Sequence, residues 1–132
     1  MKKGMLINAP ISALVSEMGH TDTLTICDSG LPTYELRRID LALRPGVPGF
    51  LETVETVLAE LQVEKAYLSE DIVQKNPTVL AGLKKLLGDT PIELIPHVDF
   101  KEKVKASKGI VRTGECTPFA NVILVAGVTF KV

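Results

Sequence analysis

Both histidines of the chain stand at the ends of predicted elements, where binding and catalytic groups tend to collect. His20 lies in Gly19–Asp22, between the end of a helix and the start of a strand, and His97 follows Pro96, where a strand passes into a helix. Because imidazole titrates near neutral pH, either ring can exchange a proton under cellular conditions. For His20 the alternative is a helix-capping or surface residue, and for His97 it is the cap of the following helix.

Two further polar residues are candidates for binding a ligand. Asp28 closes a predicted strand, where its carboxylate can accept hydrogen bonds from ligand hydroxyls or from the backbone of the next turn. Lys101 falls one helical turn after His97 and therefore on the same side of the helix. A solvated lysine is the simpler interpretation of Lys101, and the turn is the simpler interpretation of Asp28.

The segment 112–121 is polar and rich in turn-forming residues, and it leads into the last apolar strand. Asn121 can both donate and accept hydrogen bonds, which suits the hydroxyl groups of a sugar. A turn or strand-edge side chain is the alternative for Asn121. Within the same segment, Arg112 and Glu115 are most simply interpreted as a pair with each other.

Several common types of site are absent from the sequence. It contains no Gly-rich phosphate loop, no HExxH motif and no pair of CxxC motifs, so no metal site is predicted. Its two cysteines, Cys27 and Cys116, supply neither a disulfide framework nor a structural zinc site, and reduced thiols are expected. Cys27 as a nucleophile with His20 as its base is conceivable, but a cysteine next to Ile26 in a strand is more simply a small core residue.

Length and composition favour one folded domain. The chain has 132 residues, of which 45% are hydrophobic and 23% charged, so disorder is excluded and a single domain over residues 1–132 is predicted. The net charge of -1 argues against a general binder of nucleic acid or of acidic membranes. A membrane-spanning segment is not expected either, since no run of roughly 18 apolar residues occurs.

Apolar residues recur at spacings that alternate between those of strands and those of helices. The last predicted strand, 121–126, is apolar on both faces, which is typical of the middle of a covered sheet. We therefore predict an α/β fold with three α/β/α layers around a central, mostly parallel or mixed sheet. The predicted helices cover residues 10–18 (capped by Asn8), 49–61, 71–87 (adjusted at Pro77) and 98–105. The predicted strands cover residues 23–28, 39–43, 65–69, 91–95, 109–112 and 121–126.

Short distinctive segments occur in order along almost the whole chain. They are Met1–Gly4, Leu6–Asn8, Gly19–Asp22, Asp28–Pro32, Arg38–Leu43, Gly46–Pro48, His97 with Phe100 and Lys101, Arg112–Pro118, Asn121 and Ala126–Phe130. In their order, spacing and coverage these segments resemble the D-ribose pyranase family, a family of sugar mutarotases that is related to L-fucose mutarotase.

The resemblance implies a reaction on a free sugar, the interconversion of the pyranose and furanose rings of D-ribose. In that family the reaction serves ribose uptake, because the kinase that follows uses the furanose. The resemblance also implies a cytoplasmic homo-oligomer, an octameric or decameric ring with its sites near subunit contacts. Neither a metal nor an organic cofactor is implied.

The resemblance further implies the roles of individual residues. It makes His20 the catalytic acid and Lys101 a weaker substrate-side candidate, and it places around the sugar Asp28, His97, Phe119, Ala120 and Asn121. Opening a hemiacetal requires a proton at the ring oxygen, and positioned proton transfer contributes about 10²–10⁴-fold to such a rate. The family usually has Tyr where this chain has Phe119, so weaker ribose binding or a shifted sugar preference is expected.

Two alternative functions stay open on the sequence. The first is a mutarotase for another sugar, such as L-fucose, which would accelerate ring exchange of that sugar more than of ribose. The second is a non-catalytic sugar-binding subunit linked to ribose transport, which would bind the sugar without accelerating exchange.

Overall fold

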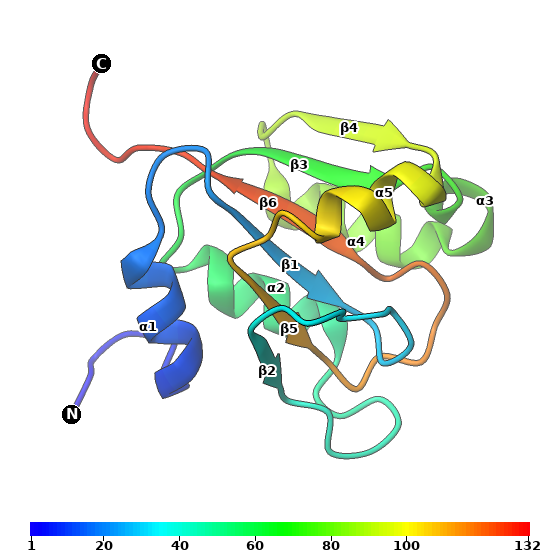
Figure 1. Ribbon diagram of the computed structural model, residues 1–132, viewed down its shortest axis with the longest axis horizontal. Coiled ribbons are helices and arrows are strands. Elements are labelled where there is room, and N and C mark those ends of the chain that lie inside the picture. The colour runs from blue at the N-terminus through cyan, green and yellow to red at the C-terminus, as the bar shows by residue number, and fades with distance from the viewer.

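A six-stranded mixed sheet forms the centre of the computed structural model, which describes residues 1–132 (Figure 1). Its strands lie in the order β2-β5-β1-β6-β3-β4. Parallel pairing joins β1 to β5, β2 to β5 and β3 to β4, and β6 runs antiparallel between β1 and β3. The strands are β1 (Thr23–Cys27), β2 (Arg38–Asp40), β3 (Val63–Ser69), β4 (Ile92–Ile95), β5 (Gly109–Arg112) and β6 (Val122–Ala126).

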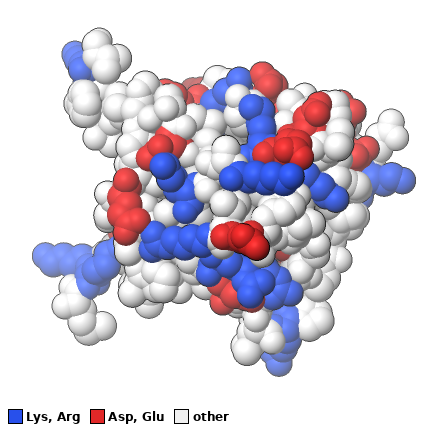
Figure 2. Space-filling model, in the orientation of Figure 1, with Lys and Arg blue, Asp and Glu red and all other residues white.

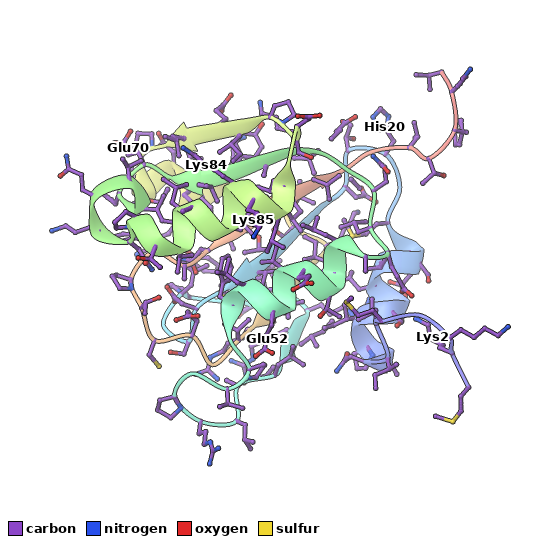
Figure 3. The ribbon with its side chains drawn as sticks, turned by 180° about the vertical axis from the view of Figure 1, so that it is seen from behind. Lys2, His20, Glu52, Glu70, Lys84 and Lys85 are labelled. Carbon is purple, nitrogen blue, oxygen red and sulfur yellow. The ribbon has the colours of Figure 1, made fainter.

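Helices cover both faces of this sheet, which confirms the predicted three layers. Two of them, α2 and α4, lie side by side on one face, while α5 covers the other (Figures 1 and 3). None of the helices is both long and apolar enough to span a bilayer. The helices are α1 (Ala9–Glu17), α2 (Phe50–Leu58), α3 (Ile72–Lys75), α4 (Pro77–Leu87) and α5 (His97–Val104).

Strand β6 supplies apolar side chains to both layers, as its sequence predicts. Val122 and Leu124 belong to the larger core cluster under α2 and α4, and Ile123 belongs to the smaller cluster, which contains Phe100 of α5. All four side chains are buried, and each stabilises the fold by about 1.5–3 kcal/mol relative to exposure. The central position of β6 follows from this two-sided burial.

The predicted single helix over residues 71–87 is wrong, because the chain breaks at Asn76. The backbone there has φ -150° and ψ 61°, and the segment divides into α3 and α4. A residue that precedes proline is driven out of the helical region by the proline ring, so Pro77 begins a new helix instead of bending an old one. The Asn76 side chain caps that helix by accepting the backbone N–H of Val79.

Other predicted boundaries differ from the observed ones by a few residues. The cap by Asn8 is confirmed, since its side chain accepts the backbone N–H of Ile11 at 2.9 Å. The helix predicted to reach residue 61 ends at Leu58, and the strand predicted over 39–43 is Arg38–Asp40. These differences leave the order and type of the elements unchanged.

The direction of the strands fixes where the loops meet. Because five strands are mutually parallel, their carboxyl ends lie along one edge of the sheet, here called the carboxyl edge, together with the start of β6. Asp28 follows β1, His97 follows β4 and Asn121 precedes β6, so all three lie at this edge. His20 precedes β1 and therefore lies at the opposite edge.

Candidate functional site

A cavity of about 230 Å³ opens at the carboxyl edge of the sheet. It is smaller than pockets for drug-sized ligands, which are roughly 300–1,000 Å³, so it suits a small molecule. Ligands of open α/β sheets commonly bind at this edge. The cavity is lined by Asp28, Gly30, Leu31, Pro32, His97, Lys101, Pro118, Phe119 and Asn121.

Asp28 both builds a turn and faces the cavity. Its Oδ1 accepts the backbone N–H groups of Gly30 and Leu31, each at 2.9 Å, which confirms the turn interpretation. Burial raises the pKa of Asp28 above 3.8, although these two N–H donors and Asn121 act in the opposite direction. The turn holds a carboxylate at the cavity wall, where it can accept hydrogen bonds from a ligand.

Asn121 is nearly fully buried, with 2% of its surface exposed. Its side-chain oxygen accepts the backbone N–H of Asp28 at 2.9 Å. The carboxamide therefore uses its acceptor within the protein, which leaves the Nδ2 amide as the group that can donate to a ligand oxygen.

His97 begins α5 and packs between two aromatic rings. Its ring meets Phe119 edge to face, with centroids 5.0 Å apart, and lies nearly parallel to Phe100 at 6.1 Å. Burial lowers the pKa of His97 below 6.5, and the positive charge of Lys101 lowers it further. Both effects favour the uncharged imidazole, which can accept a proton at one ring nitrogen and donate a hydrogen bond from the other. Its Nδ1 is buried with no hydrogen-bond partner in the chain.

Phe119 reaches the cavity from an unusual backbone conformation. Its φ of 58° lies in the left-handed region, which residues other than glycine adopt rarely and chiefly where the surroundings enforce it. The neighbouring Ala120 is fully buried and does not line the cavity. Of the three consecutive residues 119–121, the first and third contribute side chains to the cavity wall.

His20 stands apart from the residues of this cavity. Strand β1 separates it from Asp28, and at roughly 3.3 Å per residue its five residues alone span about 16 Å. Figure 3 shows His20 and Glu70, which directly follows β3, at opposite ends of the sheet. The His20 side chain is about half exposed, and its Nε2 lies 3.0 Å from Glu64 Oε2. Within one chain, the structure does not bring His20 to the cavity.

His20 instead lines a second cavity, of about 420 Å³, at the opposite edge of the sheet. The end of α1 and the C-terminal residues Gly127–Phe130 form much of its wall. Thr21, next to His20, donates its backbone N–H to the carbonyl of Ala126 at 2.8 Å, which ties this loop to the end of β6. The imidazole thus sits on an open surface beside an apolar C-terminal segment.

Of the remaining sequence predictions, the one for Cys27 is confirmed and the one for Arg112 is wrong. Cys27 is fully buried, and burial raises the pKa of its thiol to about 12, so it is a core residue and no nucleophile. Arg112 does not pair with Glu115, since its Nη1 lies 3.1 Å from both carboxylate oxygens of Asp40. No group of three or more His, Cys, Asp or Glu side chains is arranged to hold a metal ion.

Sequence reasoning missed several residues of the cavity. Gly30, Leu31 and Pro32 belong to its wall because they complete the turn that Asp28 caps, and Pro118 belongs to it because it precedes Phe119. The only signal in the sequence for these cavity residues is that they stand next to candidate residues. Together the cavity offers a carboxylate, an amide, a neutral imidazole, an ammonium group and a flat ring, which are the groups that hold a small polyhydroxylated molecule.

The surface around α5 carries no single sign of charge. Figure 2 shows Lys and Arg side chains interleaved with Asp and Glu on this face of the molecule. Ion pairs such as Lys65–Glu93, at 3.0 Å, and Lys105–Glu102, at 2.9 Å, lie on this surface. This face therefore presents no continuous basic area to a polyanion.

Comparison of the sequence with known families and proteins gives matches over nearly the whole chain. A family described as the RbsD / FucU transport protein family matches residues 1–129. A D-ribose pyranase of Symbiobacterium thermophilum is 54% identical over 131 residues, which cover 98% of this chain and 100% of that protein. A D-ribose pyranase of Yersinia pestis is 50% identical over 139 residues, with the same coverage.

Solved structures with the same fold agree with these matches. Bacillus subtilis RbsD in complex with D-ribose superposes with a TM-score of 0.95 at 39% identity, covering 98% of this chain and 100% of that one. The fucose mutarotase of Streptococcus pneumoniae in complex with L-fucose superposes with a TM-score of 0.85 at 21% identity, again over 98% and 100%. At the lower identity, the likeness concerns the fold alone.

Proposed function

The chain belongs to the RbsD / FucU transport protein family, and from that premise we propose that it is an enzyme that interconverts the pyranose and furanose forms of D-ribose. The observation that carries this proposal is 54% identity to a D-ribose pyranase over almost the entire length of both chains. The cavity at the carboxyl edge supports it, because its small size and its mixture of polar groups with one aromatic ring fit a pentose.

The reaction requires only proton transfers and a change of C–O bond. The ring oxygen of the pyranose takes up a proton as its bond to the anomeric carbon breaks, while the anomeric hydroxyl loses a proton and becomes the aldehyde. A different hydroxyl of the open chain then adds to that carbon and closes the furanose. The protein has to bind the hydroxyls, orient the open chain and supply a proton donor and acceptor.

The cavity residues are suited to the binding tasks. We infer that the Asp28 carboxylate accepts hydrogen bonds from sugar hydroxyls and that the Asn121 amide donates to a sugar oxygen. Phe119 offers a flat apolar surface to the C–H face of the ring, and Lys101 is a further donor at the rim. The neutral imidazole of His97 either orients the sugar or serves as a second proton carrier.

We propose His20 as the acid that protonates the ring oxygen, with the site completed by a second copy of the chain. The separation of His20 from the cavity within one chain requires this arrangement, because a proton donor must be within hydrogen-bond reach of its acceptor. The contact with Glu64 would hold the His20 ring in one orientation. Sites at subunit contacts agree with the ring-shaped homo-oligomer that the family resemblance implies.

The oligomer and its location are part of the same proposal. Several large apolar side chains are mostly exposed in the single chain, among them Leu43, Val98 and Phe130, and subunit contacts would cover such groups. A cytoplasmic location is inferred because the furanose product serves a kinase that follows uptake. An octameric or decameric ring is the expected assembly.

Ring-exchange NMR with D-ribose, with and without the protein, tests the activity directly. Saturation transfer between pyranose and furanose signals should accelerate with enzyme concentration, and it should do so more for D-ribose than for L-fucose. Sugar binding in calorimetry without accelerated exchange would favour the non-catalytic subunit instead. Unchanged exchange rates in a His20→Ala variant would refute the assignment of the acid to His20.

A further inference from the structure

The loop between β5 and β6 delivers two side chains to the cavity, but the residues just before Phe119 have little apolar packing. Its middle residues, Cys116, Thr117 and Pro118, are exposed, whereas Phe119 turns inward and Asn121 is buried. Hydrogen bonds must therefore fix the path of this loop. Backbone bonds such as that from Ser29 N–H to the Glu115 carbonyl, at 2.8 Å, hold its first part. The residues just before Phe119 are held by two side chains, Asn76 beneath the loop and Glu115 within it.

Asn76 holds the loop from beneath. Its Nδ2 donates to the Thr117 hydroxyl and to the Pro118 carbonyl, each at 2.9 Å, while its Oδ1 caps α4 through Val79 N–H. The side chain is 7% exposed, and these bonds use its two donor hydrogens and its oxygen. The carboxamide is thus fixed in one orientation and connects the start of α4 to the residue before Phe119.

Glu115 lies within the loop and ties it to α2. Its Oε2 accepts the Thr117 hydroxyl at 2.9 Å, and its Oε1 accepts the backbone N–H of Phe50, the first residue of α2, at 3.1 Å. Because the Thr117 oxygen accepts from Asn76, its own hydrogen is free to point at Glu115. A carboxylate is also favoured at a helix N-terminus, where it meets the positive end of the helix dipole.

We propose that Asn76 and Glu115, joined through Thr117, form a clamp that anchors the loop to the N-termini of α4 and α2 and so positions Phe119 against His97. The left-handed φ of Phe119, 58°, requires such an external constraint, since a free loop would relax to a commoner conformation. Both residues are positioning residues, and their effect on ribose rests on the proposed function. Neither residue lines the cavity, so neither is placed to contact a sugar bound there.

The variant Asn76→Asp separates the two tasks of this side chain. Aspartate keeps an acceptor oxygen for the N-cap of α4 but has no amide hydrogens for Thr117 and Pro118. Asn8→Asp is the matched control, because Asn8 caps α1 through Ile11 N–H in the same way, with a proline in the first turn of that helix too, and makes no hydrogen bond to the loop. The exposed Thr117→Val is a second test that does not depend on a buried substitution.

We expect Asn76→Asp to raise the KM for D-ribose roughly three- to tenfold, as the loss of one or two neutral hydrogen bonds implies, with a smaller change in kcat. Thr117→Val should raise KM in the same direction but less, and Asn8→Asp should leave both parameters unchanged. Melting temperatures of the three variants check that the fold persists.

A second readout is independent of activity. With 4-fluorophenylalanine at the four Phe positions, the ¹⁹F resonance of Phe119 should move in Asn76→Asp and in Thr117→Val, while that of the exposed Phe130 stays in place. If wild type does not accelerate ring exchange, the proposed function fails, and the ¹⁹F shifts alone still decide on the clamp. An unmoved Phe119 resonance in both loop variants overturns the clamp, even where KM has changed.

Discussion

The side-chain oxygen of Asn121 accepts the backbone N–H of Asp28 at 2.9 Å, and this bond joins positions that are 93 residues apart in the chain. It connects the end of β1 to the start of β6, which are neighbours in the sheet. Asp28 Oδ1 meanwhile accepts the N–H groups of Gly30 and Leu31. The bonds from Gly30 and Leu31 require an oxygen acceptor on the Asp28 side chain, and the bond to Asn121 uses only the Asp28 backbone N–H. None of them requires the negative charge, so an amide at this position could build the same turn.

We therefore expect Asp28→Asn to stabilise the fold at neutral pH while it weakens ribose binding. Burial raises the pKa of Asp28 above 3.8, so ionisation of this group costs folding free energy that a neutral amide does not cost. The cost is absent below pH 3.8, where folded and unfolded chains both hold the proton, and is complete above the raised pKa. Urea unfolding of both proteins from acid to neutral pH should show a difference in unfolding free energy that grows with pH.

Calorimetry with D-ribose is the companion measurement for Asp28→Asn. The amide loses the charge that strengthens hydrogen bonds from sugar hydroxyls, so affinity should fall although stability rises. A stability difference that is independent of pH would contradict the assigned burial cost. Unchanged affinity would remove Asp28 from the proposed sugar contacts.

The charge of Lys101 should control the titration of His97. Burial lowers the pKa of His97 below 6.5 and Lys101 lowers it further, so Lys101→Gln is expected to move that pKa upward. Since the chain has only two histidines, a His20→Ala background leaves one imidazole to follow by NMR. An identical His97 titration in the Lys101→Gln variant would show that the two side chains do not interact.

The lowered pKa of His97 also predicts how the stability of the fold depends on pH. A histidine whose folded pKa is lowered disfavours the fold as pH drops through the unfolded value of 6.5, because the unfolded chain takes up the proton first. His97→Gln should therefore flatten the loss of unfolding free energy between pH 6.5 and the lowered pKa, as measured by urea unfolding. An unaltered pH profile of stability would contradict this assignment.

The position of Phe119 offers a test of sugar affinity that leaves the backbone unchanged. Phe119→Tyr adds the hydroxyl that the family resemblance leads us to expect at this position, on a ring that already lies against His97. One additional neutral hydrogen bond is worth roughly 0.5–1.5 kcal/mol, so D-ribose affinity should rise about two- to tenfold. Calorimetry of the variant and wild type measures this, and equal dissociation constants would mean that the hydroxyl does not reach the sugar.

Local sequence signals predicted most of the elements of this fold but not how the cavity is assembled. Asn8 as a cap and the strand Gly109–Arg112 follow from neighbouring residues alone, and the structure has both as predicted. The sequence predicts an adjustment at Pro77 but not a full break at Asn76, because apolar spacing continues across it, and the steric effect of the proline ring turns the adjustment into a break. The bond between Asn121 and Asp28 depends on the pairing of β1 with β6, which no local pattern contains.

The position of His20 shows both what the sequence predicts about the site and what it does not. His20 and Asp28 flank one short strand. In any α/β sheet, the residues before and after a strand lie at opposite edges, so the sequence alone predicts that these two are apart. What the sequence of one chain does not contain is how a second copy approaches. A shared site can therefore be tested only in the assembly.

Mixing two inactive variants tests whether the site is shared between subunits. We expect His20→Ala and Asp28→Ala to be inactive when each is assembled alone, since every site then lacks either the acid or the sugar contact. In oligomers assembled from an equal mixture, about a quarter of the sites in a ring of heterologous contacts combine an intact His20 with an intact Asp28. Ring-exchange NMR on D-ribose should recover activity in that proportion.

The control for this mixing experiment uses two variants of the same residue, His20→Ala and His20→Gln. Every site in their mixed oligomers lacks the imidazole, so activity should not return. Recovery that is confined to the His20→Ala and Asp28→Ala mixture is expected only if the imidazole and the cavity of one site come from different chains, because β1 keeps them about 16 Å apart within each chain. If that mixture stays inactive although mass spectrometry detects mixed oligomers, the acid must be sought among the residues of the cavity itself, with His97 as the first candidate.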